Sequence, residues 1–352
     1  MNDAELLFEK RGNIGLVTLN RPGALNSLTH AMTVQLKDQL DAWAVDAAVQ
    51  AVVVTGAGEK AFCAGGDVVR VARSYKAGTD EWRDFFHDEY RMNVAIDEFP
   101  KPYISLVDGI AMGGGVGVSV PGDFWVATEK TMFAMPETGL GLFPDVGGGW
   151  FLPRMPGETG MYLALTGARL KAADLYAAGL ATHVVKSADT EAIIDALAAT
   201  KISCKNCVRP VLDKFHTEPE PAPLAPHMDQ IDQHFAGFSV EDIMAGLKAD
   251  PDPWAQKQHD IMVTKSPTSM KLTFEQLRRG EALETFRDTM KMEFRMVCRA
   301  MAGHDFFEGV RALLVDKDNS PVWQPATLEE VSDDMVMAYF SPLEGDTELV
   351  LD

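Results

Sequence analysis

The chain has 352 residues and 46% of them are hydrophobic, which is enough to bury a sizeable core in two or three domains. A formal net charge of −20 argues against nucleic acid or an anionic membrane as a partner, because a polyanion would be repelled over the whole surface. No apolar run approaches the roughly eighteen residues of a transmembrane helix. The N-terminus, MNDAELLFEKRG, lacks signal or transit character, which predicts a cytoplasmic protein.

The first elements predicted along the chain are a hairpin and a helix. Residues 5–10 and 14–19 are typical of two strands, joined by a turn at residues 11–13. Asn26 or Ser27 is then expected to cap a helix. Its apolar residues recur at helical spacing and are Leu28, Met32, Leu36, Leu40 and Trp43.

Short apolar strands then alternate with helices. Residues 51–55 form a continuously apolar strand, and residues 69–98 are helical and polar, with four aromatic residues expected to face inward: Trp82, Phe85, Phe86 and Tyr90. Another strand covers residues 103–107 and leads into a glycine triplet. This alternation predicts an α/β fold.

The pattern changes near residue 200. The proline-rich segment 217–226 predicts a linker, and mainly helical patterns follow it. One helix is expected to start at Ser266-Pro267, with serine as the cap and proline in the first turn. Another, from residue 283 to 301, carries a methionine-rich stripe typical of core packing. We therefore predict a core domain over residues 1–205 and a mainly helical region over residues 206–352.

Two glycine-rich turns each follow an apolar strand. One lies within residues 61–67, and the other is the triplet Gly113-Gly114-Gly115. Glycine lets main-chain amides point at a group brought close to the backbone. The two turns could therefore supply one amide each to a shared oxyanion hole, which is a pair of donors for a negatively charged oxygen.

Two carboxylates follow in one short loop. Glu137 comes directly after Pro136, and Asp145 comes after Pro144 and before a second glycine triplet. Backbone donors with two carboxylates suit a reaction that builds negative charge on a carbonyl oxygen. Taken singly, glycine triplets are more often tight turns and acidic residues more often solvated surface. The combination favours an active site.

The sequence gives little support for a disulfide framework, a zinc site or a dinucleotide-binding site. Four cysteines (Cys63, Cys204, Cys207 and Cys298) are too few and too scattered for a disulfide framework. Cys204 and Cys207 form a C-x-x-C without a second ligand pair for zinc, so we interpret them as structural or incidental. The glycine triplet lacks the third glycine of a dinucleotide fingerprint, because position 118 is Val118. The sequence predicts neither a metal nor a separate cofactor.

Several of these turns together resemble the crotonase (enoyl-CoA hydratase/isomerase) superfamily, and most closely its 3-hydroxyisobutyryl-CoA hydrolases. The long run AMPETGLGLFPDVGGG is the most specific of the matching motifs. The shorter matches are Asn20-Arg21-Pro22, Ala24-Leu25-Asn26, residues 61–67, residues 112–117 and Met135-Pro136-Glu137. The resemblance covers about residues 5–340. It implies a crotonase-like α/β fold, a spiral of ββα units with a helical C-terminal region.

The resemblance also implies roles for five residues. The backbone amides of Gly66 and Gly114 would form the oxyanion hole, Glu137 and Asp145 would be the active-site carboxylates, and Glu89 would be a third acid that contacts substrate. An ionised Glu137 would attack the thioester carbon or activate a water that does so. Asp145 would hold the substrate's 3-hydroxyl group and help to deliver the hydrolytic water.

The implied activity is hydrolysis of a short-chain 3-hydroxyacyl-CoA, in which coenzyme A is part of the substrate and not a cofactor. Hydratases of the superfamily carry a further catalytic glutamate just after the glycine triplet, where this chain has Gly117. A hydratase or isomerase is thereby disfavoured but stays an alternative, as does a non-catalytic CoA-binding relative. A homo-oligomer is compatible with the superfamily.

Overall fold

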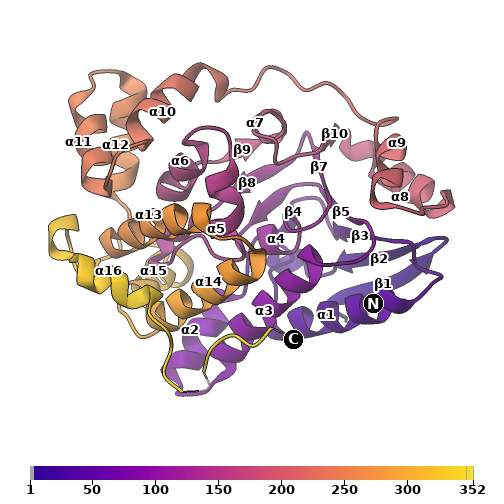
Figure 1. Cartoon of the computed structure of the whole chain (residues 1–352), viewed down its shortest axis with the longest axis horizontal. Coiled ribbons are helices and arrows are strands. Elements are labelled where there is room, and N and C mark those ends of the chain that lie inside the picture. Colours follow the sequence, from indigo (N-terminus) through magenta and orange to yellow (C-terminus); the bar gives the residue numbers. More distant parts are fainter. Residues whose placement is uncertain (1–3, 346, 352) are drawn as a thin grey trace. The chain divides into compact units, whose positions relative to one another are not determined.

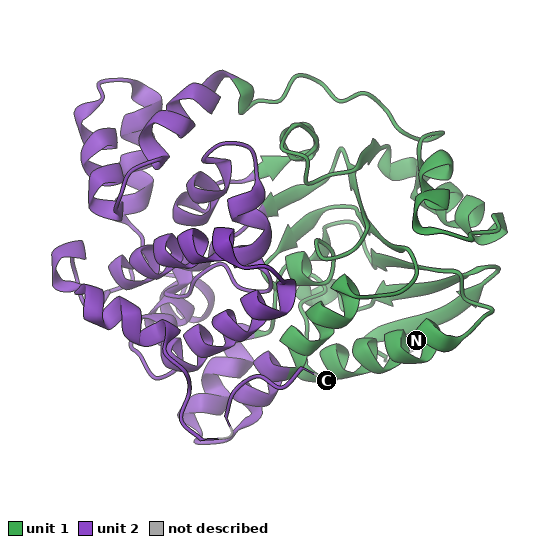
Figure 2. Ribbon diagram, viewed as in Figure 1, with its two compact units in different colours: residues 1–67, 88–133, 170–225 green, residues 68–87, 134–169, 226–352 purple. Residues whose placement is uncertain are grey.

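The structure, a computed structural model, describes residues 4–345 and 347–351 and divides into two compact units (Figure 2). The first unit comprises the residues up to 67, 88–133 and 170–225, and the second comprises residues 68–87, 134–169 and those from 226 onward. Neither unit is one continuous segment. The division into a core domain over residues 1–205 and a helical region over residues 206–352 stays a prediction.

Two sheets build the first unit (Figure 1). The larger has the strand order β1-β2-β3-β5-β7-β10, with β1 and β2 in the predicted hairpin and the later neighbours parallel. Its strands are β1 (Leu6–Arg11), β2 (Ile14–Leu19), β3 (Ala51–Gly56), β5 (Tyr103–Val107), β7 (Phe124–Thr128) and β10 (His183–Val185). The smaller has the order β4-β6-β8-β9, made of β4 (Ala61–Cys63), β6 (Ile110–Met112), β8 (Met132–Ala134) and β9 (Leu170–Lys171).

Helices cover the larger sheet. Alternate strand residues, such as Val53 and Leu106, pack with Ile193 of α8 (Thr190–Ala199) and Leu212 of α9 (Arg209–Leu212) in one buried cluster. On β1, the ring of Phe8 meets Trp43 of α1 (His30–Val45) edge to face. The unit also contains α4 (Gly114–Gly117) and α7 (Ala172–Ala177).

The start of α1 differs from the prediction. Thr29 is the N-cap, and its Oγ1 accepts a hydrogen bond from Met32 N at 3.3 Å. Asn26 instead has a left-handed backbone, with φ of 56°. Its side-chain amide donates to the carbonyls of Ala57 and Ala61, both at 2.9 Å. The predicted cap at Asn26 or Ser27 is wrong because the residues that cap helices also stabilise turns.

The second unit is almost entirely helical. The predicted helical region 69–98 is two helices, α2 (Val68–Lys76) and α3 (Glu81–Asp97), and the residues of α3 from 88 onward belong to the first unit. Phe85, Phe86 and Tyr90 are buried as predicted, whereas Trp82 is partly exposed. The other helices are α5 (Gly148–Phe151), α6 (Thr159–Thr166), α10 (Met228–Phe235), α11 (Val240–Ala249), α12 (Pro253–Val263), α13 (Pro267–Ala282), α14 (Phe286–Ala300), α15 (Asp305–Val310) and α16 (Asp333–Phe340).

Two helix predictions for the C-terminal region can be checked directly. Ser266 caps α13 as predicted, because its hydroxyl accepts a hydrogen bond from Ser269 N at 3.0 Å, and Pro267 occupies the first turn. Helix α14 begins at Phe286, three residues later than predicted, and its methionine-rich stripe is buried. Across residues 4–345 and 347–351, no helix is both long and apolar enough to cross a bilayer.

The cysteines are arranged differently from the prediction in one respect. Cys204 and Cys207 form a disulfide bond at the surface of the first unit, a pairing that the C-x-x-C spacing alone did not predict. Cys63 lies buried in β4, and burial raises the pKa of its thiol to about 12. A thiol with that pKa stays protonated near neutral pH, so Cys63 is a poor nucleophile.

Candidate active site

In the first unit, the glycine triplet forms the start of α4. Gly113 precedes the helix with φ of 47° and ψ of −124°, a conformation that strains any residue with a side chain. A Cβ added to Gly115 would lie 2.1 Å from the carbonyl oxygen of Cys63, so α4 can pack against β4 only with glycine there. Gly114 is the first helical residue, and its amide has no intrahelical acceptor.

The second glycine turn places another amide beside Gly114. Leu28 N donates to Gly65 O at 2.8 Å and Asp67 N donates to Leu28 O at 2.9 Å, which leaves the amide of Gly66 outside the pairing. Within the described part of the chain, neither Gly66 N nor Gly114 N has a hydrogen-bond acceptor. A Cβ added to Gly114 would lie 3.2 Å from Gly66 N. The two amides are therefore neighbours.

Glu89, on α3, lies beside Gly114. Its side chain is only 2% exposed, and its Oε1 would lie 2.6 Å from a Cβ added to Gly114. One helical turn later, Asn93 Nδ2 donates to Gly117 O at 2.9 Å and holds the end of α4. The first unit thus brings together three of the five predicted residues: Gly66, Gly114 and Glu89. Sequence reasoning missed Asn93, although its position four residues after Glu89 puts both on one face of the helix.

In the second unit, Glu137 begins the short 3₁₀ helix η2 (Glu137–Leu140) and is 4% exposed. Burial, followed by the charge of Asp145, raises its pKa well above the usual value for glutamate, while Lys265 acts in the opposite direction. No described residue forms a hydrogen bond with Glu137 Oε2. Burial and the charge of Asp145 thus disfavour the ionised form of Glu137 in the free protein, and the role of an ionised Glu137 stays a prediction.

Lys265 is the cation next to η2. A Cβ added to Gly139 would lie 3.4 Å from Lys265 Nζ. The following residue, Ser266, donates its backbone N–H to Thr138 O at 3.1 Å, which ties the start of α13 to η2. Burial lowers the pKa of Lys265, and the charge of Glu137 raises it. Sequence reasoning missed Lys265, because nothing local marks a lysine after α12 as a neighbour of Glu137.

Asp145 lies in the loop between η2 and α5 and is 5% exposed. Two side chains from distant helices hold this loop. Gln276 Nε2 on α13 donates to Pro144 O at 2.7 Å, and the Glu293 carboxylate on α14 accepts from the amides of Gly147 and Gly149 at 2.9 and 2.8 Å. Burial raises the pKa of Glu293 to about 8. Sequence reasoning missed Glu293, although its place on the apolar stripe of α14 was a usable signal.

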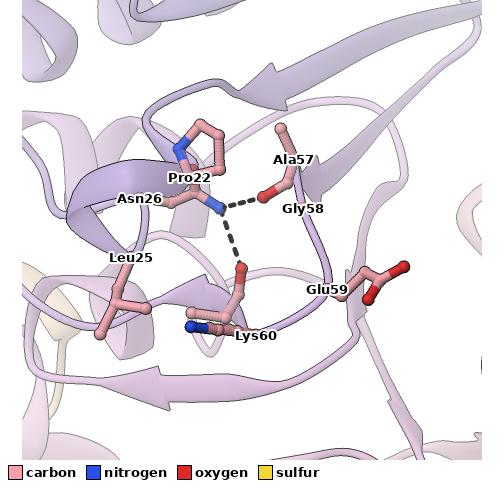
Figure 3. Close-up of a pocket in the computed structure, with 8 residues that line it drawn as sticks. Pro22, Leu25, Asn26, Ala57, Gly58, Glu59 and Lys60 are labelled. Atoms are coloured by element: carbon pink, nitrogen blue, oxygen red, sulfur yellow. Dashed lines mark hydrogen bonds between the residues drawn. The ribbon is translucent and has the colours of Figure 1, made fainter.

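A pocket of about 280 Å³ opens in the first unit, where the turn before α1 meets the connection from β3 to β4 (Figure 3). The side chain of Asn26 closes one wall through its hydrogen bonds to Ala57 and Ala61. Strand β4 runs from this pocket to the turn that holds Gly66. The lining residues are Pro22, Leu25, Asn26, Ala57, Gly58, Glu59, Lys60 and Ala61.

Among the described residues, no three histidine, cysteine, aspartate or glutamate side chains are grouped so as to hold a metal ion. The chemical groups on hand are two backbone donors with Glu89 in the first unit, and Glu137, Asp145 and Lys265 in the second. These groups suit acid–base or nucleophilic work on a polarised carbonyl.

Curated relatives match nearly the whole chain. A protein from Gallus gallus named "3-hydroxyisobutyryl-CoA hydrolase, mitochondrial" is 48% identical over 353 residues, which is 99% of this chain and 91% of that protein. The Homo sapiens protein of the same name is 46% identical over 350 residues, 98% of this chain and 90% of its own length. These names contradict the cytoplasmic location predicted from the sequence, a prediction that rested on one short N-terminal segment.

Solved structures agree with the sequence relatives on the fold. A carnitinyl-CoA dehydratase from Mycobacterium thermoresistibile superposes with a TM-score of 0.93 at 43% identity, covering 99% of each chain. An enoyl-CoA hydratase from Rhodobacter sphaeroides 2.4.1 superposes with a TM-score of 0.90 at 37% identity, covering 99% of this chain and 100% of that one. Both confirm the predicted crotonase-like α/β fold. Residues 14–340 match the enoyl-CoA hydratase/isomerase family, and the chain belongs to that family.

Proposed function

We propose that the protein hydrolyses a short-chain 3-hydroxyacyl-CoA thioester, with 3-hydroxyisobutyryl-CoA, an intermediate of valine breakdown, as its main substrate. The observation that carries this proposal is the identity of 46–48% over nearly the full length to proteins of that name. The two glycine turns and both carboxylates supply the chemistry that a thioester hydrolase needs.

The amides of Gly66 and Gly114 are the proposed oxyanion hole. They are neighbours in the first unit, they lack acceptors among the described residues, and a small side chain at each position leaves room for the thioester carbonyl. The sequence resemblance, and not a measured distance, assigns these donors and the acids of the second unit to one reaction. Preorganised donors of this kind stabilise the negative oxygen that forms when the carbonyl is attacked.

Glu137 is the proposed nucleophile or general base. As the carboxylate, it either attacks the thioester carbon or removes a proton from a water that does so. The tetrahedral oxyanion collapses, the carbon–sulfur bond breaks, and the coenzyme A thiolate leaves. It takes a proton from Glu137 on the general-base route and from solvent water on the nucleophilic route. On the first route a mixed anhydride remains, which water then hydrolyses to regenerate Glu137 and release the hydroxy acid.

We place part of the coenzyme A in the pocket beside Asn26. Its volume of about 280 Å³ is just below the range of about 300–1,000 Å³ usual for whole small ligands, so it can hold only a portion of so large a molecule. Lys60 in its lining is a cation of suitable sign for a phosphate. No separate cofactor is needed for the hydrolysis as proposed.

Asp145→Asn is expected to weaken the choice of hydroxylated substrates. If Asp145 holds the 3-hydroxyl group, the change replaces a hydrogen bond to a charged group, worth about 1.5–3 kcal/mol, by one to a neutral amide, worth about 0.5–1.5 kcal/mol. The kcat/KM ratio of 3-hydroxyisobutyryl-CoA over isobutyryl-CoA should therefore fall by about five- to tenfold. Asp229→Asn makes the same chemical change at the exposed first turn of α10 and serves as the control. An unchanged ratio in Asp145→Asn would remove this role.

The pH dependence of hydrolysis should reflect the raised pKa of Glu137. Because the carboxylate is the active form, kcat/KM should fall as the pH drops through a midpoint well above 4.5, the ordinary pKa of glutamate. Lys265→Met removes the charge that lowers this pKa, so its midpoint should move to higher pH. Lys257→Met on the exposed side of α12 should leave the midpoint in place. An unchanged midpoint in Lys265→Met would contradict the assignment of this pH dependence to Glu137.

A hydratase or isomerase of the same fold is the second candidate. The raised pKa of Glu137 favours it, because a neutral acid can deliver a proton to a substrate carbon. The two solved structures above are described as a dehydratase and a hydratase. Against it stands Gly117, at the position where hydratases carry a further glutamate.

A thiol-release assay decides between the two. Hydrolysis of 3-hydroxyisobutyryl-CoA frees one coenzyme A thiol per turnover, which a thiol reagent measures. Hydration of an enoyl-CoA changes only the absorbance of the conjugated double bond and frees no thiol. Rapid thiol release with no hydration of crotonyl-CoA supports the hydrolase, and the reverse pattern would replace it with the hydratase.

A further inference from the structure

We propose that Glu293 is a positioning residue: with Gln276, its carboxylate holds the loop around Asp145 in a strained backbone conformation that presents the Asp145 carboxyl group to the substrate. This inference rests on the proposed function. It concerns a residue that lies 148 positions (293 − 145) from Asp145 in the sequence.

The contacts of Glu293 are concentrated on this loop. Oε2 accepts from Gly147 N at 2.9 Å, and Oε1 accepts from Gly149 N at 2.8 Å and from Gln276 Nε2 at 3.0 Å. The same Gln276 nitrogen donates to Pro144 O at 2.7 Å. Asp145 is thus flanked by one held carbonyl before it and two held amides after it. Displacing Glu293 would release the two amides after Asp145 and remove one bond that fixes Gln276, which holds the carbonyl before it.

The backbone of this loop is strained, so it needs such support. Val146, directly after Asp145, has φ of 50°, and Gly147 has φ of 96°. A β-branched residue in the left-handed region is a true outlier, and such strain persists only where surrounding contacts over-determine it. The side chain of Val146 is buried, so packing holds one part of the turn. The hydrogen bonds that Gly147 and Gly149 donate to Glu293 hold the backbone after Val146.

The contacts of the site call for a carboxyl group and not for an amide. Each oxygen of Glu293 accepts from a different glycine amide, whereas glutamine would present one oxygen and one NH₂ group. The amides belong to the turn that opens α5. Glu293 is fully buried, and burial with the nearby Asp145 charge outweighs the hydrogen bonds and raises its pKa. Burying a carboxyl group costs free energy, and its hydrogen bonds to the loop explain why one is buried here.

A double-mutant cycle separates positioning from mere structural support. Glu293→Gln loses one of the two glycine contacts, and we expect kcat for 3-hydroxyisobutyryl-CoA to fall by about tenfold, and by no more than in Asp145→Asn itself, with KM changed by less than about threefold. In an Asp145→Asn background, the same change should alter kcat by less than about twofold, because the group being positioned is already gone. Equal losses of kcat in both backgrounds would overturn the proposal.

Hydrogen exchange supplies a readout that is independent of activity. Amides of residues 142–152 should exchange faster in Glu293→Gln than in the wild type, with or without Asp145→Asn. Thr289→Val is the matched control, since Thr289 is buried on the same helix and its hydroxyl has no partner among the described residues. It should change neither kcat nor exchange in the loop. Unchanged exchange in Glu293→Gln would also overturn the proposal.

A wrong functional assignment would give a different experimental result from a wrong role for Glu293. If the wild type releases no thiol, the hydrolase assignment fails, while the exchange experiment still tests whether Glu293 holds the loop. If Glu293→Gln does not fold, Gln276→Met replaces it, because that change removes only the bonds to Pro144 and Glu293. Gln276→Met should then lower kcat in the wild-type background and not in Asp145→Asn, and a kcat equal to wild type would count against the proposal.

Discussion

Glu137→Gln is expected to lower kcat for 3-hydroxyisobutyryl-CoA by about 10²- to 10⁴-fold, the range seen when a positioned acid–base group is lost. The amide has nearly the same shape as the carboxylate but can neither attack the thioester nor take a proton from water. KM should change little, since no binding group is removed. Steady-state thiol release, with the folded state checked by circular dichroism, measures both values.

The same substitution should leave the fold intact or make it more stable. Burial and the charge of Asp145 disfavour the ionised form of Glu137, and an amide carries no such charge. Glu284→Gln, at an exposed position just before α14, provides the control for kcat and for the melting temperature. Hydrolysis at the wild-type rate by Glu137→Gln would eliminate both the nucleophile and the general-base roles.

Gly114→Val is the second change with a large expected effect. A Cβ there would lie 2.6 Å from Glu89 Oε1 and 3.2 Å from Gly66 N, so the added side chain fills the space in front of both amides. Loss of one oxyanion donor typically lowers kcat by about 10²- to 10³-fold, and blocking both should cost at least as much. The measurement is kcat by thiol release, beside the melting temperature.

Two further variants make the Gly114 result interpretable. Gly114→Ala should give an intermediate loss, because Glu89 can turn its carboxylate away from a single methyl group. Gly246→Ala on α11 is the control, as its added Cβ would make only an ordinary contact, 3.5 Å from His234 Nδ1. A well-folded Gly114→Val enzyme with near-normal turnover would refute the oxyanion hole as drawn.

The candidate site divides into residues that the sequence could reveal and residues that it could not. Gly66, Gly114, Glu137 and Asp145 lie in short motifs whose glycines and prolines are themselves the signal. Their roles remain predictions, but their local surroundings could be anticipated. The fold was predictable for the same reason, since long specific motifs match the family over residues 14–340.

What escaped prediction depends on contacts between distant segments. Gln276 and Glu293 come from helices after residue 250 and hold the loop near residue 145, while Lys265, between α12 and α13, lies beside η2. No local sequence pattern predicts a contact between segments so far apart in the chain. The raised pKa of Glu137 could not be predicted for a related reason, because burial depends on everything packed around the side chain. The shift of the α1 cap from Asn26 to Thr29 shows that turn and cap residues share one chemistry.

The interleaved course of the chain has a consequence for protein engineering. The backbone passes between the two units five times, after residues 67, 87, 133, 169 and 225. A fragment that stops at residue 205 would keep all five predicted site residues in its sequence, yet it would lack the helices that brace the Asp145 loop. A chimaera with a relative that is joined at a single point between residues 68 and 224 would split both units. Only exchange of three matched segments at once would transplant either unit whole.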